Sequence, residues 1–144
     1  GIMHAESNHS KDKPLRLLQM WVFANKKNLA PSWEQKKFTK KERTNKLVPV
    51  IVSENSSDVN ALHIHQDATF YLSSLTPNGQ VQHKLGPARK SYLFVIDGKI
   101  KLGNDIMQTR DAAMISQEDN VTILAEEQTE LILIDLPEKY AVNI

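Results

Sequence analysis

The sequence predicts an all-β fold, a β-sandwich or barrel in which a jelly roll is the leading arrangement. About ten short apolar runs follow one another at roughly even spacing, each bounded by turn residues. None of them shows the long apolar stripe of an amphipathic helix. Three dipeptides with strong turn preference, Asn78-Gly79, Asp97-Gly98 and Gly103-Asn104, separate runs in the second half of the chain. A chain of 144 residues with these features forms one domain that is large enough to bury its own core.

The first third of the chain contains two candidate strands and a polar connection. LRLLQMWVF (15–23) is apolar and long enough for a buried strand, and SWEQKKF (32–38) follows it as a second candidate. The polar segment 39–46 is compatible with one helical turn. The β-branched run 47–53 comes next, and Pro49 predicts an edge strand or the start of a strand because proline donates no ladder hydrogen bond.

Alternation of apolar and polar residues becomes clear in the rest of the chain, where it is typical of half-buried strands. The candidate strands here are 61–65, 68–75, 81–85, 91–102, 112–116, 121–125 and 130–136. Asn78-Gly79 predicts a hairpin between the second and third of these, and Asp97-Gly98 repeats the signal. The expected core consists of the apolar residues of 15–23, 91–96, 121–125 and 130–136.

The composition excludes several classes of protein. There is no cysteine, so a disulfide scaffold, a thiolate metal site and a cysteine nucleophile are excluded. With five glycines, the chain has little material for a phosphate-binding loop. No apolar run approaches membrane-spanning length, and the first residues lack the order of a signal peptide. A cytoplasmic protein is the expectation.

The charges are unevenly distributed. Residues 26–46 carry eight Lys or Arg against two Glu, and residues 105–138 carry nine Asp or Glu against Arg110 alone. Two solvated faces that keep the domain in solution are the favoured interpretation, and a binding face for an oppositely charged partner is the alternative. The basic stretch has few interleaved aromatic residues and no recognised motif, so direct nucleic-acid binding is not expected.

Two histidine-containing pairs consist of side chains that can bind a metal ion. His4 and Glu6 lie two positions apart, and in an extended segment both side chains point the same way, as two ligands of a non-haem iron site do. An ordinary chain terminus is the alternative for this pair. His63 and His65 form a His-x-His pair on one strand face, which is a secondary metal candidate, and two partly exposed strand histidines are the alternative.

The remaining titratable residues of note are assigned structural roles. His83 is expected to be an outward-facing strand residue. Asp67, Asp97 and Asp111 fall at turns and are expected to cap them.

Three features in order resemble the pirin family. GIMHAESN is similar to the family's Gly-Ile-x-His-Ser-Glu-x-Asn segment, with Ala5 in place of the serine. LRLLQMWVF and APSWEQKKF resemble its Leu-x-x-Gln-x-Trp and Pro-x-Tyr-x-Gln stretches. HIHQDATFYL, SYLFVIDGKIKLGN and TRDAAMIS are similar to the C-terminal barrel of bacterial pirins. The resemblance implies a cupin-type jelly-roll barrel.

Pirins are bicupins, and the resemblance implies a divided metal site. In the family one iron lies in the N-terminal barrel, held by three histidines and a glutamate. His4 and Glu6 match one histidine and the glutamate, and the family's earlier His-x-His pair has no counterpart in this sequence. We therefore expect residues 1–10 to be a remnant of a preceding N-terminal metal-site strand and residues 11–144 to be the C-terminal cupin domain. Fe2+ is the cofactor expected for the intact protein, and this chain alone is not expected to hold it firmly.

For function, the resemblance implies an oxidoreductase of the quercetin 2,3-dioxygenase type as the intact protein, with this chain inactive by itself. The alternative is a protein-interaction or regulatory module without catalysis, since pirins also bind transcription regulators. A third possibility is a small ligand held in the barrel without metal. The expected partners are a second copy of the chain, through the face that a missing barrel would leave, or a regulatory protein; the alternative to that dimer is disorder of the first ten or so residues.

Overall fold

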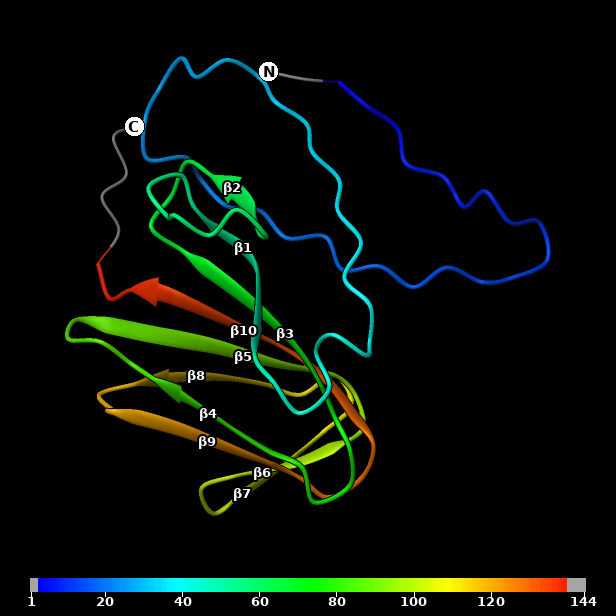
Figure 1. Cartoon of the computed structure of the whole chain (residues 1–144), viewed down its shortest axis with the longest axis vertical. Helices are drawn as coiled ribbons and strands as arrows, with labels where there is room; N and C mark the ends of the chain where they lie inside the picture. Colours follow the sequence, from blue (N-terminus) through cyan, green and yellow to red (C-terminus); the bar gives the residue numbers. More distant parts are fainter. Residues whose placement is uncertain (1–2, 140–144) are drawn as a thin grey trace.

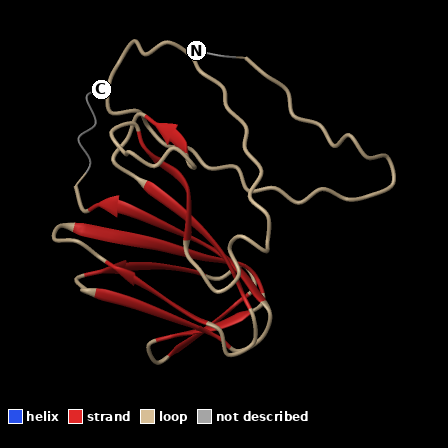
Figure 2. Cartoon of the chain, viewed as in Figure 1, coloured by secondary structure: helices blue, strands red, loops and turns tan. Residues whose placement is uncertain are grey.

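The computed structural model describes residues 3–139, which form two facing β-sheets (Figure 1). The described residues contain strands and loops but no helix, so the predicted all-β class is confirmed (Figure 2). The strands are β1 (Val48–Ser53), β2 (Leu62–Ile64), β3 (Thr69–Leu75), β4 (Gln80–Lys84), β5 (Arg89–Asp97), β6 (Lys99–Leu102), β7 (Asp105–Gln108), β8 (Ala112–Ser116), β9 (Asn120–Ala125) and β10 (Thr129–Pro137). No helix in this part of the chain could cross a membrane.

The strands divide between a larger and a smaller sheet. The six-stranded sheet has the order β2-β1-β3-β10-β5-β8, and the four-stranded sheet has the order β4-β9-β6-β7. Every pairing is antiparallel except that of β1 with β2. Because the chain crosses repeatedly from one sheet to the other, the arrangement is the predicted jelly roll rather than a series of hairpins.

The six-stranded sheet is apolar on both faces. One face meets the smaller sheet, and the core between them contains fully buried aliphatic side chains: Leu75, Leu93, Ile100, Ile123, Leu131 and Leu133. Each such side chain contributes roughly 1.5–3 kcal/mol through its removal from water. The opposite, outer face holds a second cluster that includes Phe70, Ile132 and Ile134. A sheet with this pattern is typically covered on both sides.

Two of the predicted hairpins are wrong, although the turns themselves are present. Asn78 and Gly98 both adopt positive φ, of 63° and 101°, as the turn dipeptides require. However, β3 and β4 belong to different sheets, as do β5 and β6, so these turns carry the chain between the layers. Only Gly103-Asn104 closes a hairpin, between β6 and β7. Turn preference is local, whereas strand pairing is decided by the remainder of the fold.

The predicted strands at 15–23 and 32–38 are also wrong. Neither segment belongs to a strand or joins a ladder among the described residues. Residues 15–23, expected in the core, run across the outer face of the six-stranded sheet, where Trp21 is 85% and Phe23 73% exposed (Figure 1). An apolar run becomes a buried strand only when a neighbouring strand pairs with it, and none of the described strands does.

The predictions for the polar segment 39–46 and for Pro49 agree with the structure more closely. The polar segment 39–46 contains a turn in which Arg43 N donates a 3.2 Å hydrogen bond to Lys40 O. β2 pairs only with residues 51–53 of β1, so Pro49 lies beyond β2, where its missing N–H leaves no gap in that ladder. The predicted division into 1–10 and 11–144 stays a prediction, and residues 1, 2 and 140–144 lie outside the described residues.

Candidate functional site

The first predicted metal pair, His4 and Glu6, comes together in an extended segment. His4 Nε2 lies 3.4 Å from Glu6 Oε1, and the two side chains are 55% and 63% exposed. The two side chains therefore face the same region, as their spacing predicts. Residues 3–139 contain no group of three or more His, Cys, Asp or Glu side chains that could hold a metal ion. Since a protein metal centre uses at least three such ligands, the pair does not form a complete site within the described residues.

The two residues of the second predicted pair, His63 and His65, have different surroundings. His63 is exposed on β2, whereas His65 lies just after β2 and forms an ion pair through Nδ1 with Glu54 Oε2. Lys26 Nζ contacts the same carboxylate at 3.2 Å. The hydrogen bond from His65, and then that from Lys26, lowers the pKa of Glu54. Here too the described residues bring no third ligand to the pair, and a metal at this position stays a prediction.

His65 and its neighbour instead hold the N-terminal segment against the sheet. Asn25 N donates a 2.8 Å hydrogen bond to His65 O, and Gln66 Nε2 donates one of 2.7 Å to Phe23 O. Together with the Lys26–Glu54 ion pair, these contacts attach residues 23–26 to the loop between β2 and β3.

The prediction that His83 faces outward is wrong, because this residue is buried between the sheets. His83 Nε2 lies 2.6 Å from Asp135 Oδ2, and Arg89 Nε donates a 2.6 Å hydrogen bond to Asp135 Oδ1. Arg89 Nη1 in turn reaches Asp67 Oδ2 at 2.7 Å. Asp67 is therefore an ion-pair partner of Arg89 and not the turn cap that was expected.

The sequence contains a signal for the orientation of His83. Val81 and His83 of β4 and Leu85 just after it alternate with polar residues, and this alternation places all three on the buried side. The sequence contains no signal that Asp135 is the partner of His83, since Asp135 lies 52 positions further along the chain.

In this cluster the effect of burial on the pKa values of Asp135 and Arg89 is opposed by their hydrogen bonds and ion pairs. Burial would raise the pKa of Asp135, but the hydrogen bonds from His83 and Arg89 outweigh it and the pKa is lowered. Burial would lower the pKa of Arg89, but Asp67 and Asp135 hold it above its ordinary value. Burial, and then the charge of Asp135, raises the pKa of Tyr71, whose ring centroid lies 5.1 Å from that of His83. The paired charges of His83, Arg89 and Asp135 link three strands, β4, β5 and β10.

One polar atom beside this cluster lacks a partner. Ser91 Oγ is buried and forms no hydrogen bond with the described residues, and Ser91 is in register with Asp135 across β5 and β10. The cluster thus combines ionic groups, a phenol and a free hydroxyl at one place inside the barrel. It is the ionic part of an interior whose buried side chains are mostly aliphatic.

The other predicted residues have structural contacts. Asp111 Oδ2 accepts a 2.8 Å hydrogen bond from Gln108 N, which confirms Asp111 as a turn cap. Asp97 Oδ1 accepts a 3.4 Å hydrogen bond from Thr109 Oγ1. The basic and acidic stretches meet where Lys40 and Arg43 both pair with Glu130, so part of each stretch is neutralised within the chain.

Comparison with known proteins places this fold and sequence among the pirins. Residues 50–136 match the quercetinase C-terminal cupin domain family. The chain is 35% identical over 135 residues to a pirin-like protein of Caulobacter vibrioides, covering 94% of this chain and 57% of that protein. It is 28% identical over 137 residues to the quercetin 2,3-dioxygenase of Escherichia coli K12, covering 95% of this chain and 57% of the enzyme. The chain therefore spans little more than half the length of these relatives.

Solved structures support the fold. The structure of YhhW from Escherichia coli superimposes with a TM-score of 0.75 at 23% identity, covering 83% of this chain and 49% of YhhW. A nickel(II) complex of the same bacterial pirin gives a TM-score of 0.73 at 23% identity, covering 81% of this chain and 48% of that one. At this identity the likeness establishes the cupin fold.

Proposed function

Because this chain belongs to the pirin family, as a quercetinase C-terminal cupin domain, we propose that it is the C-terminal half of an iron-dependent protein of the quercetin 2,3-dioxygenase type. The observation that carries this proposal is the His4–Glu6 pair, two ligand-type side chains 3.4 Å apart and open to solvent on the same side of an extended segment. In the proposal they supply two ligands of the iron, and residues outside 3–139 supply the others. This chain alone does not turn over quercetin.

An anaerobic titration of the chain with Fe2+, followed by calorimetry, tests this division of the site. We expect no saturable one-to-one binding to the wild type, to His4→Ala or to a His63→Ala, His65→Ala double variant. The proposal would be overturned by iron-dependent quercetin turnover by these 144 residues.

The variants identify the site if binding occurs. Binding that is lost in His4→Ala means that the chain rebuilds a complete centre, for example between two copies. Binding that is lost only in the double variant places the metal beside β2.

A second candidate function, an interaction module, is favoured by the exposed aromatic residues of the N-terminal segment. Trp21, Phe23 and Trp33 are each at least 73% exposed, and exposed aromatic groups are enriched where proteins bind one another. We propose a second copy of the chain as the partner. Light scattering would then give about twice the 16.3 kDa of the monomer, and a Trp21→Ser, Phe23→Ser variant would be monomeric. A monomeric wild type contradicts this candidate.

A further inference from the structure

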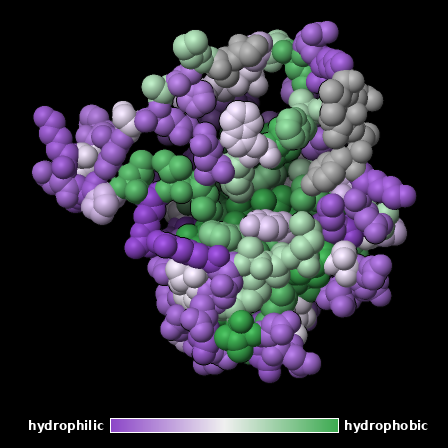
Figure 3. All heavy atoms as spheres, turned by 180° about the vertical axis from the view of Figure 1, so that it is seen from behind, coloured by the Kyte–Doolittle hydropathy of each residue, from purple (hydrophilic) through white to green (hydrophobic). Residues whose placement is uncertain are grey.

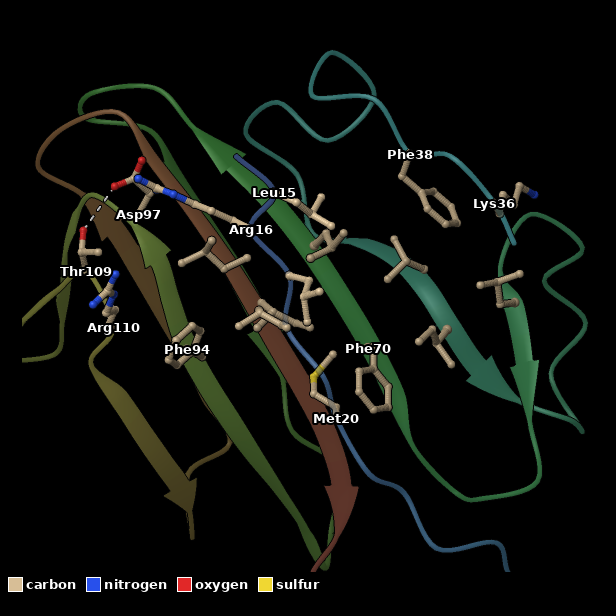
Figure 4. A pocket seen from close by; sticks show the side chains of 18 residues that line it. Leu15, Arg16, Met20, Lys36, Phe38, Phe70, Phe94, Asp97, Thr109 and Arg110 are labelled. Carbon is tan, nitrogen blue, oxygen red and sulfur yellow. Dashed lines mark hydrogen bonds between the residues drawn. The ribbon is translucent and has the colours of Figure 1, made fainter. Parts of the chain in front are cut away.

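A large cavity lies between the N-terminal segment and the outer face of the six-stranded sheet. It has a volume of about 910 Å³, which is within the range of small-molecule sites. Leu72, Phe94 and Ile132 stand side by side in register across β3, β5 and β10 and form its floor. Leu15 and Met20 of the N-terminal segment line it as well (Figure 4), as does Leu17.

The cavity extends along the sheet. A second cavity of about 530 Å³ shares Met20 and Phe70 with the first and continues to Ile134 and Leu136. From the side opposite to that of Figure 1, apolar side chains gather around a hollow in this region (Figure 3). The space is thus elongated and lined mainly by aliphatic and aromatic side chains.

Cationic side chains line this apolar space, and two of them, Arg16 and Arg110, have no side-chain partner among the described residues. Arg16 and Arg110 lie with Asp97 and Thr109 at one end of the larger cavity (Figure 4). Neither arginine side chain forms an ion pair or hydrogen bond with any residue in 3–139. Lys36 also lines the cavity, with its Nζ 5.8 Å from the centre of the Phe38 ring. Two arginines thus lie at the same end of the cavity as one carboxylate, that of Asp97, whereas Lys36 lies at the opposite end (Figure 4).

The backbone at Arg110 is strained. Its φ is 76°, in the left-handed region that L-residues other than Asn, Asp and Gly rarely adopt. Arg110 N donates to Val95 O at 2.7 Å and Asp111 N donates to Gln108 O at 2.9 Å, and the Asp111 side chain caps the turn by accepting from Gln108 N. None of these bonds uses the Arg110 side chain. Glycine would make the same bonds without strain. A long cationic side chain at such a position, lining a cavity, indicates that the side chain itself is used.

We propose that this cavity binds a linear aliphatic carboxylate of medium chain length. Its carboxylate lies between Arg16 and Arg110, since guanidinium groups bind carboxylates through paired hydrogen bonds. Its chain lies along Phe94, Ile132 and Leu72 toward Met20, because an elongated aliphatic wall fits a linear apolar body better than a compact one. This site is separate from the His4–Glu6 pair and does not depend on the iron proposal.

Calorimetric titration of the full 144-residue chain with decanoate, below its micellar concentration, tests the proposal. We expect saturable one-to-one binding, weakened at least tenfold in Arg110→Gly and in Arg16→Ala. The Arg110→Gly protein is expected to be at least as heat-stable as the wild type, because glycine relieves the left-handed backbone, so the loss of binding will not reflect unfolding.

Gln117→Gly is the matched control. Gln117 also has a positive φ, of 61°, and lies exposed in the turn between β8 and β9, where it does not line the cavity. This variant should gain the same backbone relief and bind decanoate like the wild type.

Several results would overturn the proposal. These are no saturable decanoate binding, equal affinity of the wild type and Arg110→Gly for decanoate, and equal affinity of the wild type for decyltrimethylammonium, which has the same chain and the opposite charge. Sedimentation with phosphatidylglycerol vesicles without binding of free decanoate would assign the cations to a lipid surface, and it would overturn the proposal as well.

Discussion

His83 of β4 and Asp135 of β10 join the two sheets of this barrel through a 2.6 Å contact between Nε2 and Oδ2. The other carboxylate oxygen of Asp135 is held by Arg89, which also reaches Asp67. A single carboxylate thus accepts hydrogen bonds from both sheets in a largely buried setting. The consequences for stability follow from the high free-energy cost of leaving such charges without a partner.

Replacing Asp135 should destabilise the fold strongly. Asp135→Ala leaves His83 and Arg89 without their buried acceptor, and we expect a loss of about 3–5 kcal/mol in the free energy of unfolding. Urea denaturation followed by tryptophan fluorescence measures this. Asp105→Ala, at an exposed residue of β7, is the control and should change stability by less than about 0.5 kcal/mol. Equal losses in the two variants would show that the buried network contributes nothing.

Stability should fall in acid because of the same residue. The pKa of Asp135 in the folded protein lies below its ordinary value of 3.8, so in that range the unfolded chain binds more protons than the folded one. The contribution of Asp135 is therefore complete above about pH 4 and is lost as the pH falls through the folded value. Urea midpoints measured from about pH 5 down to 2 should decline less steeply in Asp135→Asn than in the wild type. Parallel declines would contradict the assignment to this residue.

Two turn glycines should differ in their tolerance of alanine. Gly103 has φ of 59° and open space where a Cβ would lie, so Gly103→Ala should cost only the left-handed backbone penalty of about 1–2 kcal/mol. Gly98 has φ of 101°, and a Cβ there would lie 2.5 Å from Gln128 O and 2.5 Å from Thr129 Oγ1. Gly98→Ala should cost more than Gly103→Ala in thermal or urea unfolding. A smaller cost at Gly98 would mean that the turn between the sheets is free to shift.

The N-terminal segment should loosen when His65 is removed. His65→Ala deletes the ion pair with Glu54, which also binds Lys26, while the exposed His63 provides a control at the neighbouring strand position. Because the pair is partly exposed, its effect is small, and we expect hydrogen exchange at the Asn25 amide to become roughly two- to fivefold faster. His63→Ala should leave that exchange rate unchanged. An equal effect of both variants would show that the His65–Glu54 ion pair does not hold the N-terminal segment.

The all-β class, the turns and the described β-strands after residue 47 other than β7 could be predicted from the sequence. Alternation with a period of two and dipeptides such as Gly103-Asn104 are local signals, and a strand or turn needs no distant residue to produce them. The same alternation places Val81 and His83 on one face of β4, although we predicted that His83 faces outward. It also predicted the common direction of His4 and Glu6.

The sheet that each strand joins, the contacts of His83 and the position of the apolar segment 15–23 depend on the three-dimensional arrangement of the chain. Asp67, Arg89 and Asp135 are separated by 22 and 46 positions, so their ion pairs exist only after β5 and β10 have paired. LRLLQMWVF reads as a core strand, but burial of an apolar run depends on a partner strand that the run itself does not encode. Local chemistry specifies backbone shape and side-chain alternation, whereas pairing and burial are properties of residues that meet from distant parts of the chain.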